Sequence, residues 1–294
     1  MTPSYPQSFQ GLQAWAKANN IPADLAKLRF AQYVILRAIT NSRSLSGFLV
    51  FKGGNALDFM WQPNRSTLDL DFSIARVVLD LDHEADNLRE LFTRALGAIG
   101  PQFGVLCRVA TVKQEPAGSN KTFVTYRVQI AYALPDQEPL RRRMEVRPEW
   151  PGSQHIKVEI SINEPICADE QIDIAGTNLL RVSTIEDIVA EKLRALLQQP
   201  IRNRTRPQDL LDIAVILRTE TPLDHYKVAD FLLRKADARN IPVSKSAFYD
   251  VEIMGRANAG YDELKKTART LFIPFEEARD LLYAFVDTLT IDEA

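Results

Sequence analysis

The stretch that decides the fold is Phe51-Lys52-Gly53-Gly54-Asn55-Ala56-Leu57, followed after a short polar break by Arg65-Ser66-Thr67-Leu68-Asp69-Leu70-Asp71-Phe72-Ser73. In its second half, two acidic residues alternate with apolar ones, although acidic residues are poor strand formers. Because successive side chains point to opposite faces of a strand, we expect Asp69 and Asp71 to share one face. Two neighbouring carboxylates repel each other unless a cation lies between them. The stretch therefore predicts a half-buried strand that holds a divalent metal ion.

The di-glycine Gly53-Gly54 comes at the end of a strand-like run over residues 48–51, which follows a predicted break at residues 44–46. Glycine lets a backbone approach a ligand closely and adopt positive φ. Taken alone, the pair is also typical of an ordinary tight turn. Its place just before the two aspartates favours a phosphate-binding turn, because attack on an α-phosphate needs a phosphate cradle beside metal-holding carboxylates.

A third carboxylate is predicted on a strand over residues 155–163. Ile156, Val158 and Ile160 fall on one face of this strand, and Glu159 falls on the other. Beside Asp69 and Asp71, Glu159 would complete a three-carboxylate metal site. The alternative is an exposed strand residue with no ligand.

The second part of the chain reads as helices from residue 179 onward. One of these helices carries Lys192, and the next carries Asp209 and Asp212, whose spacing of three places them on one face. Between the two helices, Arg202, Arg204 and Arg206 form a short basic cluster. We therefore expect an α+β fold with two domains: residues 1–180, a mixed sheet with flanking helices, and residues 181–294, which are all helical.

Composition excludes several classes of protein. The net charge is −2, so polynucleotide contact requires a local basic patch. The two cysteines are too few for a disulfide framework, and the three histidines lack metal-ligand spacing. The N-terminus has no apolar signal region, and no apolar run approaches the ~20 residues that span a membrane. We expect a cytoplasmic protein.

Four stretches in order, residues 52–57, 65–73, 186–196 and 206–213, resemble the motifs of the AbiEii/AbiGii nucleotidyltransferase toxins, a family that includes the mycobacterial MenT toxins. The order of the four stretches carries the resemblance, since no single one would suffice. The resemblance implies a polymerase-β-like nucleotidyltransferase core followed by a helical domain.

The resemblance also implies roles for individual residues. The catalytic set would be Asp69, Asp71, Lys192 and Asp209, in which the first two hold Mg²⁺, with Mn²⁺ as the alternative, and Lys192 contacts the NTP phosphates. The substrate-binding set would be Lys52, Gly53, Gly54, Arg65, Ser66, Arg206 and Asp212. One departure is Gln208, which stands where the family usually has a basic residue before the first aspartate of the last motif. It leaves open whether Asp209 or Asp212 is the functional acid.

The function implied is that of a toxin in a toxin–antitoxin or phage-defence system. It would transfer a nucleotide from an NTP to an RNA acceptor, the 3′ end of tRNA, and so block translation. A cognate antitoxin encoded nearby would be its protein partner. Two alternatives stay open: nucleotidyl transfer to a protein or small-molecule hydroxyl, and a non-catalytic NTP- or RNA-binding partner.

Overall fold

The computed structural model describes residues 5–61, 67–75, 81–117, 123–147, 154–174, 179–219, 222–268 and 271–293, without the side chains of residues 81 and 82. The chain divides into two compact units. The first comprises residues 1–55, 67–163 and 171–182, and the second comprises residues 56–66, 164–170 and 183–294. Two short segments that precede residue 183, residues 56–66 and 164–170, therefore belong to the mainly C-terminal unit. The domain division at residue 180 stays a prediction.

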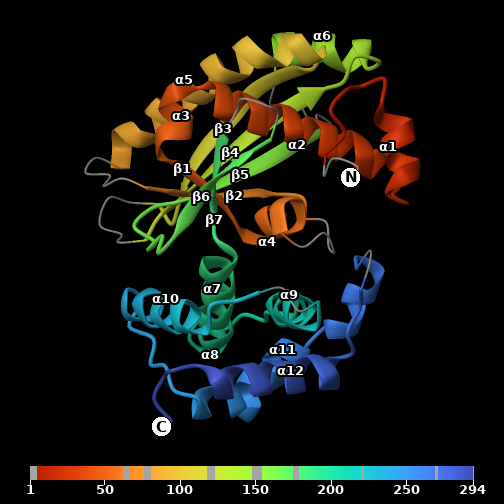
Figure 1. The fold of residues 1–294 in the computed structure, drawn as a ribbon. Coiled ribbons are helices and arrows are strands. Elements are labelled where there is room, and N and C mark those ends of the chain that lie inside the picture. Colours follow the sequence, from red (N-terminus) through yellow and green to blue (C-terminus); the bar gives the residue numbers. More distant parts are fainter. Residues whose placement is uncertain are drawn as a thin grey trace. The chain divides into compact units, whose positions relative to one another are not determined.

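Seven strands of the described chain form one mixed sheet (Figure 1). They are β1 (Leu49–Lys52), β2 (Leu70–Ile74), β3 (Leu106–Glu115), β4 (Thr125–Ala133), β5 (Gln154–Ser161), β6 (Asp169–Asp173) and β7 (Leu179–Ser183), in the spatial order β3-β4-β5-β2-β1-β7-β6. β2 is antiparallel to β1 and parallel to β5, and β1 is parallel to β7. The helical reading from residue 179 was therefore wrong for β7, which is a strand beside β1.

Helices cover the sheet of the first unit. They are α1 (Leu12–Ala18), α2 (Ala23–Asn41), α3 (Arg43–Phe48), α5 (Leu81–Ile99) and α6 (Glu138–Val146), with one 3₁₀ turn, η2 (Gly100–Phe103). Figure 1 shows α2 and α5 lying across one face of the sheet. The break predicted at residues 44–46 is wrong, because α3 runs through it. The Ser42 hydroxyl accepts a hydrogen bond from the Leu45 N–H at 3.3 Å, and Leu45 is fully buried.

After β1 the chain enters α4 (Gly53–Ala56), which continues as the π-helical turn η1 (Leu57–Trp61). Gly53 is thus the first residue of a short helix. β2 begins after the undescribed residues 62–66. The connection between the first two strands therefore carries the whole di-glycine motif.

The second unit is built from α7 (Ile185–Leu197), α8 (Gln199–Arg202), α9 (Pro207–Arg218), α10 (His225–Asp237), α11 (Val251–Asn258) and α12 (Phe275–Thr288), with 3₁₀ turns η3 (Ser246–Tyr249) and η4 (Tyr261–Lys266). α7 packs against α10 and α9, and α9 packs against α12. Thr184 caps α7, since its hydroxyl accepts from the Asp187 N–H at 3.3 Å. In the described part of the chain, no helix combines the length and apolarity that crossing a membrane requires.

Candidate active site

Asp71 is the second residue of β2, the middle strand of the sheet, and Asp69 lies directly before that strand. Leu70 and Phe72 are fully buried, whereas the two aspartates are partly exposed, which is the alternation expected from the sequence. In the strand register, Asp71 lies opposite Lys52 of β1 on one side and Glu159 of β5 on the other. The sheet thus brings three predicted site residues into adjacent positions.

Basic residues of the first unit compensate these carboxylates unequally. Lys157 Nζ lies 3.9 Å from Asp69 Oδ2, and Arg127 Nη2 lies 3.1 Å from Glu159 Oε1. Burial raises the pKa of Asp69 above its ordinary value; Lys157 opposes this rise in pKa and Glu159 adds to it. Asp69 is therefore a carboxylate whose charge would be stabilised by a further cation, while Glu159 already has an arginine partner.

The Asp71 side chain leaves no room for any residue but glycine at position 53. The φ angle of Gly53 is +72°, and a Cβ built on it would lie 2.5 Å from Asp71 Oδ2 and 3.0 Å from Asp71 Cγ. Neither the backbone conformation nor the space admits a side chain. Gly53 therefore leaves room for the Asp71 carboxylate. This packing role differs from the phosphate contact that the sequence predicted for Gly53 and Gly54.

Three buried polar side chains fix the backbone that carries Asp69. Arg29 Nη1 donates to Asn55 Oδ1 at 3.0 Å, and the Asn55 amide donates in turn to the carbonyls of residues 67 and 69. Gln32 Nε2 donates to the carbonyls of residues 67 and 68, at 3.3 and 3.0 Å. Arg29, Gln32 and Asn55 are all fully buried. Buried amide and guanidinium groups are costly unless paired, so this network holds residues 67–69 in one conformation.

Sequence reasoning missed these three residues as parts of the site. The signal was present, because Arg29 and Gln32 interrupt the apolar pattern of α2 at positions that face the core. A polar side chain that is fully buried within an apolar helix needs a specific partner. Its partner here lies in the Gly53-Gly54-Asn55 motif, which no local pattern indicates.

The carboxylates of β2 fit a divalent cation through their chemistry. Mg²⁺ and Mn²⁺ prefer carboxylate oxygens, and the partly exposed Asp69 and Asp71 flank the buried Leu70 where β2 begins. Within the described residues, no group of three His, Cys, Asp or Glu side chains is arranged to hold a metal ion. A metal proposal therefore rests on the two aspartates, and a metal-binding role for Glu159 stays a prediction.

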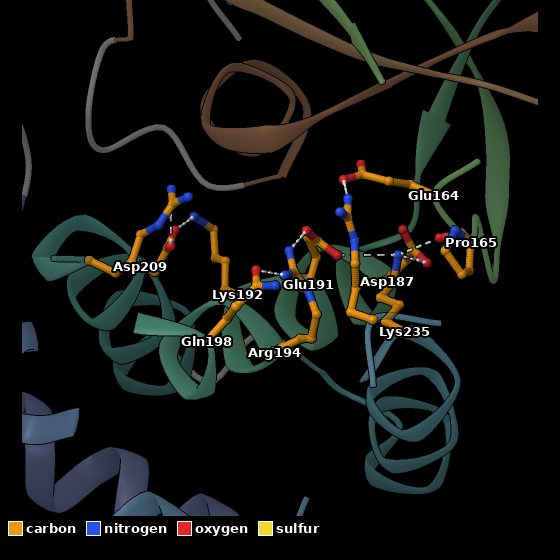
Figure 2. Close-up of polar contacts among 11 residues, drawn as sticks. Glu164, Pro165, Asp187, Glu191, Lys192, Arg194, Gln198, Asp209 and Lys235 are labelled. Carbon is orange, nitrogen blue, oxygen red and sulfur yellow. Dashed lines mark hydrogen bonds and ion pairs between the residues drawn. The ribbon is translucent and has the colours of Figure 1, made fainter. Parts of the chain in front are cut away.

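In the second unit, Lys192 of α7 bridges two carboxylates of α9, those of Asp209 and Asp212. Figure 2 shows the contact of Lys192 with Asp209. Its Nζ lies 2.8 Å from Asp209 Oδ1 and 2.7 Å from Asp212 Oδ2. The side chain of Asp212 is 4% exposed and that of Asp209 is 13% exposed. Of the two acids, Asp209 is thus the more accessible to a substrate.

The remaining predicted residues lie near the start of α9 or outside the described chain. Arg206 Nη1 lies 3.9 Å from Asp209 Oδ2, which adds a second cation to that carboxylate. Gln208, the residue that departs from the family pattern, is exposed. Arg65 and Ser66 lie outside the described residues.

A buried ionic network follows Lys192 along α7, as Figure 2 shows, and was not predicted from the sequence. Lys235 of α10 lies 3.0 Å from Asp187 and donates to the Pro165 carbonyl at 2.8 Å. Arg239 pairs with Glu164 beside it. These contacts fasten residues 164–170 to α7 and α10 and are structural in character.

A family model described as "Nucleotidyl transferase AbiEii toxin, Type IV TA system" matches residues 34–282. The chain belongs to this family. It is therefore a nucleotidyltransferase toxin of a type IV toxin–antitoxin system, which implies an NTP substrate and an antitoxin partner. A search of curated proteins found no matching sequence.

Two solved structures from Helicobacter pylori resemble the AbiEii chain. One is the crystal structure of a candidate nucleotidyltransferase, with 17% identity over 91% of this chain and 95% of that one and a TM-score of 0.52. The other, JHP933, has 18% identity over 96% of this chain and 92% of that one and a TM-score of 0.49. The first of these confirms the α+β fold predicted from the sequence.

Proposed function

We propose that this AbiEii toxin transfers a nucleoside monophosphate from an NTP to an RNA acceptor, the 3′ end of tRNA, in a reaction that requires Mg²⁺. The observation that carries the proposal is the partly exposed pair Asp69 and Asp71 where β2 begins, with Gly53 packed where only a glycine leaves room for the Asp71 carboxylate. In a nucleotidyltransferase family, such a pair is what metal-assisted phosphoryl chemistry needs.

The proposed reaction is in-line attack by an acceptor hydroxyl on the α-phosphate, with pyrophosphate as the leaving group. Asp69 and Asp71 would hold the divalent ion, which supplies charge stabilisation at the attacking and leaving oxygens. Gly53 and Gly54 would let the triphosphate approach the backbone. Arg29, Gln32 and Asn55 would act only through position, by keeping residues 67–69 in place.

The second unit would contribute Lys192 and Asp209. Lys192 donates to both carboxylates and so holds them in fixed orientation. Asp209 is the more exposed partner and is therefore the acid that we propose for the reaction, with Asp212 holding Lys192 from the buried side.

The test is incubation of the purified toxin with total tRNA, Mg²⁺ and each labelled NTP in turn. We expect label on tRNA with at least one NTP, and its loss in Asp71→Ala. The matched control is Asp136→Ala, which removes an exposed aspartate of the same unit outside the site. Near-normal labelling by Asp71→Ala would contradict the metal-binding role of this residue.

The same assay separates the acceptor classes. Label on a protein or a small molecule, with none on any RNA, would overturn the RNA proposal and leave the nucleotidyltransferase assignment intact. Expression in cells adds a second measurement: the wild-type protein should arrest growth and Asp71→Ala should not. Equal arrest by both proteins would favour a non-catalytic mode of toxicity.

A further inference from the structure

The segment between α7 and α9 presents arginines from a firmly anchored backbone. Gln199 is 1% exposed, and its side-chain amide donates to the carbonyls of Leu196 and Ile253, both at 3.1 Å. Its Oε1 accepts from the Arg206 N–H at 2.8 Å, and its carbonyl accepts from the Arg204 N–H at 3.0 Å. One buried side chain thus fixes both ends of the segment that carries the arginines.

Arg202 and Arg204 extend from this segment into solvent. Both are exposed, and within the described residues neither forms an ion pair or a side-chain hydrogen bond. This contrasts with the buried arginines of the same unit, Arg194 and Arg239, which are paired with glutamates. Two unpaired guanidinium groups on an ordered loop retain their full capacity for an external anion.

Neighbouring side chains extend the surface that Arg202 and Arg204 form. Arg256 of α11 donates to Asn203 Oδ1 at 3.0 Å, so it lies beside the loop. Ile201 is 61% exposed and Val251, at the start of α11, is 87% exposed. Arginines interspersed with exposed apolar side chains are suited to a nucleic acid, whose phosphates take the charge and whose sugars and bases take the apolar contacts.

An ordinary solvated loop is the simplest alternative. Two features favour a ligand. Arg206 and Arg256 pair with Asp209 and Glu252, at 3.9 and 2.9 Å. The chain as a whole has a net charge of −2, so the two arginines that have no ion-pair partner among the described residues, Arg202 and Arg204, are a local departure from its average. The segment also leads directly into α9, whose first turn carries Asp209, and Arg206 lies 3.9 Å from that carboxylate. A polyanion held by the loop would therefore lie beside one of the proposed catalytic residues.

We infer that residues 201–206, together with Arg256, form the surface that binds the phosphate backbone of the acceptor RNA. This inference rests on the proposed function, because it presupposes an RNA acceptor. The loop supplies phosphate contacts that position the acceptor without reading its sequence.

The decisive variant is Arg202→Ala/Arg204→Ala. Its control is Lys227→Ala/Arg234→Ala, which removes two exposed positive charges from α10 of the same unit. Circular dichroism and thermal melting first establish that both proteins fold. In transfer assays with total tRNA, the loop variant should show a KM for tRNA raised about tenfold at low salt, with the KM for NTP unchanged. Loss of two phosphate contacts should also reduce the slope of log KM against log salt by about 1.4 to 1.8.

Binding measured without turnover separates this inference from the proposed function. In the Asp71→Ala background, fluorescence anisotropy with a labelled tRNA transcript should give tight, salt-sensitive binding. The loop substitutions should weaken it about tenfold, and the α10 substitutions should leave it unchanged. If the loop variant binds tRNA as tightly as its control, the inference is wrong even when transfer to RNA is established. If the wild-type protein labels no RNA, the proposed function itself fails.

Discussion

Replacement of Gly53 by alanine tests the geometry at the centre of the proposed site. The new Cβ would lie 2.5 Å from Asp71 Oδ2 on a backbone whose φ is +72°. A left-handed conformation costs a residue with a side chain ~1–2 kcal/mol. Moving the Asp71 carboxylate out of its rotamer costs a further ~0.5–1.5 kcal/mol. Alanine also restricts the unfolded chain, which offsets ~0.4–1 kcal/mol of this loss.

The expected net loss in unfolding free energy is therefore about 0.5–3 kcal/mol, which urea denaturation can measure. The effect on catalysis should be larger, because a displacement of ~1 Å in a reacting constellation can cost about 100-fold in rate. We expect transfer activity to fall by at least that factor, with weaker binding of Mn²⁺ measured by electron paramagnetic resonance.

The matched control is Gly97→Ala in α5. No atom lies within 4 Å of a Cβ at Gly97. This substitution should stabilise the first unit by ~0.5–1 kcal/mol through the preference of helices for alanine, with activity unchanged. The reasoning would be refuted if Gly53→Ala kept activity and Mn²⁺ affinity within a few-fold of the wild-type values.

Three further substitutions test other parts of the structure. Asp69→Asn should abolish transfer yet raise the unfolding free energy at neutral pH, because burial raises the pKa of Asp69 and so penalises its ionised form in the folded state. This gain in stability should vanish as the pH falls below ~3.9, where the carboxyl group is protonated in the unfolded chain as well. Urea titration at several pH values measures the change. Asn55→Asp keeps an acceptor for Arg29 but loses the amide that donates to the Asp69 carbonyl, so kcat should fall while circular dichroism stays native; an unchanged kcat would exclude a positioning role. Lys235→Met leaves Asp187 buried without its ion-pair partner and should lower the unfolding free energy by ~3–5 kcal/mol; a loss below ~1 kcal/mol would indicate that the ion pair is not a structural anchor.

The part of the site predicted from sequence is the part set by local patterns. Alternation predicts that Asp69 and Asp71 are partly exposed while Leu70 and Phe72 are buried, and the structure has this pattern although β2 begins only at Leu70. The start of α7 is likewise set locally, because threonine is a favoured N-cap residue and the Thr184 hydroxyl accepts from the Asp187 N–H. These signals need only a few neighbouring residues, so a single sequence carries them.

What could not be predicted depends on contacts between distant residues. The register that sets Asp71 beside Glu159, and Arg127 against that glutamate, joins three strands far apart in the chain. Likewise, the strand β7 reads locally as the approach to a helix, and its pairing with β1 and β6 makes it a strand. Tertiary pairing decided these elements, because intrinsic strand preference is weak and depends on context.

The role of Lys192 can be argued further from its surroundings. The resemblance assigns it to the NTP phosphates, yet Asp209 and Asp212 both lie within 2.8 Å of its Nζ. An anionic phosphate that approached this lysine would meet two carboxylates and would compete with Asp209 for a donor. The arrangement instead favours a lysine that orients Asp209.

The two roles predict different kinetics for Lys192→Met, a substitution of similar length without the charge. Loss of a phosphate contact would raise the KM for NTP, whereas loss of an orienting partner would lower kcat and leave the KM for NTP unchanged. We expect the second result. Because the buried Asp212 and the partly exposed Asp209 would then lose the cation between them, stability should also fall. Adding Asp212→Asn should restore part of the stability without restoring kcat. A raised KM for NTP with an unchanged kcat would instead support a contact between Lys192 and the NTP phosphates.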